Sequence, residues 1–487
     1  MFISDLVLCG FGLHPQKYIY VCAFVDYILT KLNQTQMPKT KKLHLAQQEI
    51  YLGQMIDPQS SLYNIGGYTV LKGQLNVELF KNILEELPSF FDVFSMRFSS
   101  SSKGPSYHLE DKIQKIPVEE VDLSHYEDPV ASAKKWIQRE FDVPFNIETD
   151  RLCRFTLFKI SEEEYWWQIL FHHLIIDGFG FAVLINHVTD RYDQLIQGTV
   201  KELNYPSYVE TINKNIAYLS SKQFLADKEY WESKYKEVPK ALVTPKNISK
   251  EEFPGGERFS YSISASERSL FERLTKSTGA SLPQLTIAAL LLYFGKTTAE
   301  KDISIGTPIH NRGGRAERNT LGMFVSVLAY KGSYDPEQSV LECLAEIKKT
   351  QRNDIRHRNY PISFLNRSLS MLSESRQHIF DVIVNYEPLG FREKLASGID
   401  VEQKHMTSTK HLQYPLSIRW CDYGAEVPME LKVDYMTRYL SKEDIVFFVD
   451  RLFFILRQFE ESLANPLNDI LIVPKSEQQL LLKDFQS

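Results

Sequence analysis

The sequence lacks the features that mark several protein classes. Its 487 residues include only five cysteines, and no two of them form a C-x-x-C pair; they are residues 9, 22, 153, 343 and 421. An odd, dispersed set argues against a disulfide framework and against a zinc cage, and it fits a reducing cytoplasm. The net charge of −6, with scattered basic residues, gives no electrostatic reason to expect nucleic acid or anionic lipid as a partner.

Long hydrophobic runs and low-complexity tracts are also missing. The apolar stretch at residues 1–29 lacks a basic start and is interrupted by Asp5 and again at His14–Lys17. It is neither a signal peptide nor an unbroken span of about 20 apolar residues, so we expect no membrane-spanning segment. We interpret residues 1–38 as an N-terminal extension of uncertain role, either a short docking segment or sequence upstream of a start at Met37.

Helical and strand-like patterns alternate along the rest of the chain. Hydrophobic residues make up 43% and charged residues 24%, as in an ordinary globular protein. Apolar residues three to four apart predict helices, and short β-rich runs predict strands. The predicted helices are 43–56, 76–87, 128–141, 178–198, 226–235, 264–279, 281–298, 337–355 and 441–464. The predicted strands are 68–75, 91–98, 107–116, 153–160, 165–173, 302–309, 378–389 and 427–436.

The length of 487 residues suggests two to three structural units, because roughly 150 residues make one domain, and the alternation of helices and strands predicts two α/β lobes of similar size. Polar sequence around residues 211–223 marks the predicted boundary between the lobes. We therefore expect an N-terminal lobe at 39–215 and a C-terminal lobe at 216–470.

The segment WWQILFHHLIIDGFG at residues 166–180 carries the chemistry. An apolar strand runs into His172 and His173, and Asp177 follows three apolar residues later. Consecutive strand side chains point to opposite faces, so one histidine is structural and the other is available for chemistry. Asp177 stands before a helix, where its carboxylate can cap exposed N–H groups or accept an ion pair from a distant arginine.

Two further expectations concern the start of this helix. Gly178 permits a tight turn and close approach of a substrate. The helix N-terminus offers N–H groups and a positive dipole end, which suit a developing oxyanion. We expect no metal here, because zinc proteases place two histidines one helical turn apart, whereas adjacent strand histidines do not converge on one ion.

The heptapeptide HHLIIDG at residues 172–178 resembles the HHxxxDG signature of the condensation domains of nonribosomal peptide synthetases. Other segments resemble motifs of that family in the right order, from about residue 39 to the end of the chain. They are residues 43–67, 91–98, 205–210, 305–312, 321–331, 357–361 and 380–388.

The resemblance implies an α/β fold of two lobes, each similar to chloramphenicol acetyltransferase, that form a V-shaped pseudo-dimer with a central tunnel. It also implies amide-bond formation between two acyl groups held on the 4'-phosphopantetheine arms of upstream and downstream carrier proteins. No cofactor of the domain's own is expected. An isolated domain is expected to be a monomer. Residues 471–487 resemble the linker into an adjacent adenylation domain, so we expect the chain to be a piece of a larger synthetase.

The resemblance also assigns residues. His172, His173, Asp177 and Gly178 are the fixed residues of the motif. Among them, His173 is expected to be the catalytic histidine, and Asp177 is expected to be the carboxylate that orients it. Arg312, from the other lobe, is expected to be the ion-pair partner of Asp177. Asn385 resembles an asparagine that lines the tunnel.

The sequence departs from the family pattern at two places. The usual Arg/His-Glu pair of the second motif is absent, and Arg97 is the matching basic residue. Phe179 and Gly180 replace the commoner Trp-Ser, a variation similar to some domains of initiation modules. The donor class therefore stays open among L-aminoacyl, D-aminoacyl and fatty- or aryl-acyl groups.

Three alternative functions remain. An epimerisation domain also carries HHxxxDG but forms no new amide. An acyl-CoA acyltransferase has the same lobe type, although the D-F-G-W-G pentapeptide of the plant enzymes is absent. A non-catalytic recruitment domain usually has a damaged signature, whereas the signature here is intact.

Overall fold

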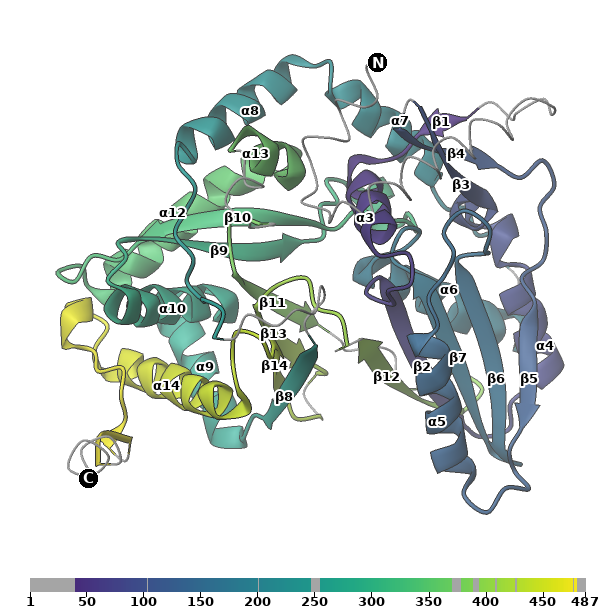
Figure 1. The fold of residues 1–487 in the computed structure, drawn as a ribbon. Helices are drawn as coiled ribbons and strands as arrows, with labels where there is room; N and C mark the ends of the chain where they lie inside the picture. The colour runs from purple at the N-terminus through teal and green to yellow at the C-terminus, as the bar shows by residue number, and fades with distance from the viewer. Residues whose placement is uncertain are drawn as a thin grey trace.

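The computed structural model describes residues 40–102, 104–199, 201–246, 255–369, 378–388, 394–407, 410–424, 427–475 and 477–479. The extension expected at residues 1–38 lies outside the described residues. The described chain forms two α/β lobes that lie side by side in a V (Figure 1). This is the fold class that the sequence predicts.

A mixed five-stranded sheet in the order β12-β2-β7-β6-β5 forms the centre of the N-terminal lobe. Its strands are β2 (Asn64–Lys72), β5 (Val118–Asp122), β6 (Cys153–Ser161), β7 (Glu164–His172) and β12 (Asp400–Thr407). Only β5 and β6 pair in parallel. A smaller sheet has the order β1-β4-β3 and contains β1 (Lys41–Lys42), β3 (Met96–Ser101) and β4 (Gly104–Leu109).

Helices cover both faces of the five-stranded sheet. Helices α4 (Val77–Glu85) and α6 (Gly178–Ile196) contribute to the main core of this lobe together with Trp167 of β7. Helix α5 (Pro129–Asp142) packs in a separate cluster with Phe158 of β6. Helix α3 (Leu45–Ile56) lies against the end of β7, where its glutamines bind the histidine motif.

A six-stranded sheet in the order β10-β9-β11-β13-β14-β8 forms the centre of the C-terminal lobe. Its strands are β8 (Gly256–Ser262), β9 (Asp302–Ile309), β10 (Ser326–Ser333), β11 (Val382–Pro388), β13 (Leu416–Asp422) and β14 (Glu430–Met436). The pairs β9–β11 and β11–β13 are parallel, and the other pairs are antiparallel.

The apolar face of this sheet is covered by long helices, namely α9 (Ala265–Thr278), α10 (Leu282–Thr298), α12 (Val340–Arg356) and α14 (Lys442–Glu461). Helix α10 is apolar around most of its circumference because other helices and the sheet surround it. On the other side, α8 (Lys222–Lys234) and α13 (Ile362–Ser368) form a smaller cluster with β10.

One strand joins the two lobes in a way that the sequence did not predict. Strand β12 follows β11 in the chain, yet it pairs antiparallel with β2 at the edge of the N-terminal sheet (Figure 1). Gly67 permits this pairing, and Gly66 permits the pairing of β2 with β7 on its other side. A Cβ on Gly67 would lie 2.0 Å from the carbonyl oxygen of Lys404, and one on Gly66 would lie 2.0 Å from that of Ile169. Only glycine lets three backbones approach this closely.

Two strand predictions need correction. Residues 92–95 form a 3-10 turn rather than a strand, and the Asp92 carboxylate of this turn caps helix α7 (Tyr208–Tyr218). Strand β4 ends at Leu109, and residues 110–116 are irregular. Within the described residues, no single helix has the length and apolarity to cross a bilayer, and only α9 and α10 together, bent by 91°, meet that test.

Candidate active site

His172, at the end of β7, is held on both ring nitrogens. Its Nδ1 accepts a hydrogen bond from the backbone N–H of Leu174 at 3.1 Å, and its Nε2 lies 3.0 Å from Oε1 of Gln54. Because Nδ1 accepts, Nε2 carries the proton and donates it to Gln54. The ring is fully buried. Burial, with a smaller contribution from the neighbouring His173, lowers the pKa of His172 to about 3. His172 is therefore a neutral structural residue.

His173 differs from His172 in its exposure and in its hydrogen bonding. Its backbone N–H donates to the carbonyl of Tyr63 at 2.7 Å, which continues the β2–β7 pairing by one residue. The residue as a whole is only partly buried, although its Nδ1 atom is buried and has no hydrogen-bond partner among the described residues. Burial lowers the pKa of His173, while the charge of Asp177 and the carbonyls of His173 and Ile176 act in the opposite direction. At neutral pH the ring is an uncharged imidazole with a lone pair to offer.

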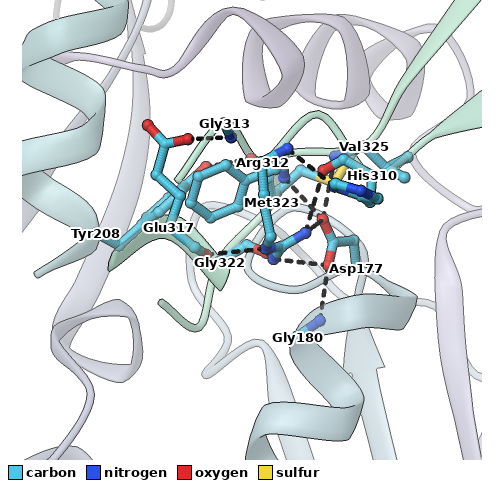
Figure 2. A network of polar contacts seen from close by, with 11 residues as sticks. Asp177, Gly180, Tyr208, His310, Arg312, Gly313, Glu317, Gly322, Met323 and Val325 are labelled. Carbon is cyan, nitrogen blue, oxygen red and sulfur yellow. Dashed lines mark hydrogen bonds and ion pairs between the residues drawn. The ribbon is translucent and has the colours of Figure 1, made fainter. Parts of the chain in front are cut away.

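The Asp177 carboxylate is completely buried, and all its hydrogen bonds are with protein groups. Oδ1 accepts from Gly180 N at 2.8 Å and from Arg312 Nη2 at 2.9 Å. Oδ2 accepts from Arg312 Nη1 at 2.8 Å and from the backbone N–H groups of Phe324 and Val325 at 2.9 and 3.0 Å. Figure 2 shows this carboxylate between the guanidinium and the start of α6. Burial acts to raise the pKa of Asp177, but Arg312 and these donors hold it below its ordinary value.

The N–H groups of Arg312, like the carboxylate oxygens of Asp177, all form hydrogen bonds. Its Nε donates to the carbonyl of Glu317 at 3.1 Å, and its Nη atoms reach the carbonyls of His310 and Gly322 at 3.3 Å. The guanidinium also lies over Phe179 and Phe324, at 4.7 and 4.1 Å from the ring centroids. Such a fork-to-fork pair, with every remaining donor bonded, is the arrangement that a buried ion pair requires. The structure brings Asp177 and Arg312 together across the lobes.

The glycines after Asp177 have other roles than those expected. Gly178 is exposed, has no left-handed backbone, and would have open space around a Cβ, so no tight turn requires glycine there. At Gly180, by contrast, a Cβ would lie 2.9 Å from Cγ1 of Ile176 and 3.4 Å from the carbonyl oxygen of Gly322. The N–H of Gly180 is bonded to Asp177. This donor of the helix end is therefore occupied by Asp177 and is not free for an oxyanion.

Several distant motifs converge on this ion pair. Asp92 accepts hydrogen bonds from the start of α7 and so fixes Tyr208, whose hydroxyl donates to the carbonyl of Met323 at 2.5 Å. The Tyr208 ring covers Gly322, where a Cβ would lie 2.2 Å from Cδ2 of the ring. The loop that carries Phe324 is thereby positioned to donate its N–H groups to Asp177. The tyrosine segment at 205–210 thus holds the loop that binds Asp177, and Tyr208 is the residue that contacts this loop.

The sequence did not predict roles for two residues that bind the histidine motif and its backbone. Gln47 of α3 donates from Nε2 to the carbonyl of Leu174 at 2.8 Å, and Gln54 binds His172. The Ala-Gln pair of the first motif was a signal for Gln47. Gln54 gave no local signal, because His172, which it binds, is 118 residues away in the sequence.

The remaining predicted residues lie elsewhere. Asn385, on β11, donates from Nδ2 to Glu387 at 2.8 Å, and no described hydrogen bond joins it to the histidine motif. Arg97, on β3, forms an ion pair with Glu110 at 2.7 Å. Among the described residues, no three His, Cys, Asp or Glu side chains converge in a way that could hold a metal ion.

Comparison with known sequences adds family relationships. A family model described as the condensation domain matches residues 37–482. The dimodular nonribosomal peptide synthase of Bacillus subtilis (strain 168) is 23% identical over 458 residues, which cover 92% of this chain and 19% of that protein. Surfactin synthase subunit 1 of the same organism is 23% identical over 444 residues, with coverage of 90% and 12%. The chain thus spans less than a fifth of the length of these curated relatives.

Solved structures share the fold. A variant of the starter condensation domain of rhizomide synthetase RzmA, in complex with C8-CoA, superposes with a TM-score of 0.77 at 22% identity, covering 89% of this chain and 98% of that one. The first condensation domain of the calcium-dependent antibiotic synthetase, in complex with a substrate analogue, has a TM-score of 0.74 at 19% identity, with coverage of 89% and 100%. The two-lobed arrangement is therefore one that solved condensation domains also adopt.

Proposed function

Because this chain belongs to the condensation domain family, we propose that it forms an amide bond between a donor acyl or peptidyl thioester and the amine of an acceptor aminoacyl thioester. Both substrates are delivered on the phosphopantetheine arms of carrier proteins. One observation carries this proposal. At the end of β7, a neutral and only partly buried imidazole stands beside groups whose hydrogen bonds are all made.

In the proposed reaction the acceptor amine attacks the donor carbonyl carbon. A C–N bond forms, the C–S bond breaks, and the donor arm leaves as a thiolate. The amine loses one proton, which His173 accepts or directs, and the thiolate takes up one proton to become a thiol. An α-amino group has an ordinary pKa of about 7.7–8.0, so only a modest proton transfer is needed. The uncharged ring of His173 suits this task.

Positioning is the larger catalytic effect under this proposal. General-base catalysis contributes about 10²–10⁴-fold, whereas holding two tethered reactants in register can lower the barrier by about 7–11 kcal/mol. Asp177 acts on structure, because Arg312, Gly180 and two backbone N–H groups occupy its oxygens and none is left for a substrate. We propose that the tunnel for the two arms runs between the lobes past His173, with Asn385 on its wall.

A second candidate differs only in the donor. The similar starter condensation domain of rhizomide synthetase RzmA was solved in complex with C8-CoA. In addition, Phe179-Gly180 resembles the sequence of some initiation-module domains. Under this alternative, an acyl-CoA provides the acyl group directly and no upstream carrier is needed. The amide-forming step at His173 is the same.

The deciding experiment mixes the purified chain with donor- and acceptor-loaded carriers and weighs the carrier-bound products by mass spectrometry. A longer acyl-aminoacyl or peptidyl chain on the acceptor carrier means condensation. An inverted stereocentre with no new amide means epimerisation, and binding without turnover means recruitment. Replacing the donor carrier with acyl-CoA distinguishes the two donor forms.

A further inference from the structure

The side chain of Gln54, on α3, turns a hydrogen-bond acceptor toward the histidine motif. Its Nε2 atom donates to the carbonyl oxygens of Asp57 at 3.0 Å and Ser60 at 3.1 Å, which uses both N–H groups of the amide. Its Oε1 atom lies 3.0 Å from Nε2 of His172. A flipped amide would place its oxygen against two carbonyl oxygens, so this network fixes the orientation. Gln54 is buried, and the acceptor is therefore a fixed feature of the site.

The two partners of the His172 ring require the same tautomer. The oxygen of Gln54 needs the proton on Nε2, and the backbone N–H of Leu174, at 3.1 Å, needs a lone pair on Nδ1. In the other tautomer, the Nδ1 proton would face that N–H, and the Nε2 lone pair would face the amide oxygen. Both hydrogen bonds would be lost inside the protein, where unmade hydrogen bonds are costly. The ring is thus a bridge between Gln54 and the Leu174 N–H.

Leu174, the residue after His173, is also held by a second glutamine of α3. Gln47 donates from Nε2 to the carbonyl oxygen of Leu174 at 2.8 Å. Gln47 and Gln54 are seven residues apart, which places them about two turns apart on one side of the helix. Helix α3 thus fixes both polar backbone groups of Leu174, the carbonyl directly and the N–H through His172.

The backbone of His173 is bonded on both sides of its Cα. Its own N–H donates to the carbonyl of Tyr63 at 2.7 Å, and the N–H on the other side is that of Leu174. We propose that Gln54 is a positioning residue for the amide-forming reaction. By holding the His172 ring, it holds the N–H of Leu174, and this bond sets where the His173 ring stands. The reaction rests on the proposed function, whereas the bridge rests on the hydrogen bonds alone.

NMR signals of the ring and of the amide test the bridge without any turnover. Ring nitrogens labelled with ¹⁵N show which one carries the proton, and His172→Asn identifies the signals of His172. We expect the proton on Nε2 in the wild type. Gln54→Met, which removes the acceptor at a similar side-chain length, should shift this signal. It should also speed hydrogen exchange of the Leu174 amide about tenfold, because one end of the bridge is lost.

Rates per folded molecule test the positioning of His173. Gln54→Met should lower kcat about ten- to hundredfold and leave the KM for each loaded carrier unchanged, because a misplacement of about 1 Å can cost about 10²-fold. In a His172→Asn background the same change should have no further effect, since the bridge is already broken. Gln48→Met is the matched control. Gln48 lies on the same helix but donates to the carbonyl of Leu43 at 2.9 Å, so each readout should stay as in the wild type.

Three results would each overturn the proposal. They are a His172 ring with its proton on Nδ1, wild-type kcat per folded molecule in Gln54→Met, and additive losses in the double variant. If Gln54→Met does not fold, Gln54→Asn takes its place, because its shorter amide cannot span the same distances. If the wild type forms no amide, the proposed function is refuted instead, and the ring and amide signals still decide whether Gln54 holds the bridge.

Discussion

The two histidines of the motif are neighbours in sequence and opposites in environment. His172 is buried, has both ring nitrogens bonded, and has its pKa lowered to about 3. His173 is partly exposed, and one ring nitrogen has no partner in the described structure. The same contrast separates His173 from Asp177, whose oxygens are all occupied. The comparison teaches that the polar atoms of His172 and Asp177 are taken up by partners within the protein, whereas His173 stays partly exposed.

The largest effect is expected from His173→Ala. Product formation should fall by about 10²–10⁴-fold, because a positioned base or acceptor is lost. The melting temperature should stay close to that of the wild type, since the ring nitrogen Nδ1 has no partner to lose. Rates from the carrier assay and thermal unfolding measure the two quantities. His125→Ala, at an exposed loop position, is the matched control, and normal turnover by His173→Ala would refute the assignment.

Asp177→Ala tests whether the fully bonded Asp177 acts on stability rather than on chemistry. Removing this carboxylate leaves Arg312 buried without its partner, which costs about 3–5 kcal/mol of unfolding free energy. Asp128→Ala removes another helix cap, whose carboxylate accepts from just the N–H of Ala131 within the described part of the chain, and should cost about 0.5–2 kcal/mol. Chemical denaturation of both variants gives the comparison. A stable but inactive Asp177→Ala protein would point instead to a direct chemical role.

Gly180→Ala and Gly178→Ala distinguish the two glycines of the helix start. At Gly180 the new methyl meets Ile176 and the backbone of Gly322, so we expect a loss of about 1–3 kcal/mol. At Gly178 it meets nothing, and the change should stay within about 0.5 kcal/mol. If Gly178→Ala nevertheless lowers the rate, the cause is the approach of a substrate. Equal stability of the two variants would contradict the packing described for Gly180.

The last prediction concerns acid sensitivity. The pKa of His172 is about 3 in the folded chain and about 6.5 when unfolded, so the unfolded state binds the extra proton between these values. The stabilising contribution is therefore fully present above pH 6.5 and decreases as the pH falls, by up to about 1.4 kcal/mol per pH unit. Urea unfolding at pH 7 and pH 5 should show a shallower loss for His172→Gln. His125→Gln should keep the wild-type slope.

Much of the local structure could be predicted from the sequence. Periodicity located α4, α5, α6 and α14 to within about two residues at most of their ends. Alternation in the strand identified one structural and one available histidine, since strand geometry leaves no other choice. The turn at residues 92–95 was missed, because its hydrogen bonds go to α7, more than a hundred residues away.

Long-range contacts explain the other omissions. The close approach of β12 to β2 needs Gly67, and no local pattern in β12 shows which sheet it joins.

The sequence by itself determined the elements and the chemical groups, because backbone geometry and apolar spacing act over a few residues. It determined that an imidazole would stand at a strand end and that a carboxylate would cap the next helix. The motif resemblance had already indicated His173 and the pairing of Arg312 with Asp177, whereas only the tertiary structure decided that Gly180 is sterically required and that β12 joins the sheet of the N-terminal lobe. These outcomes depend on burial and on partners from the other lobe, and both exist only once the two lobes have packed together.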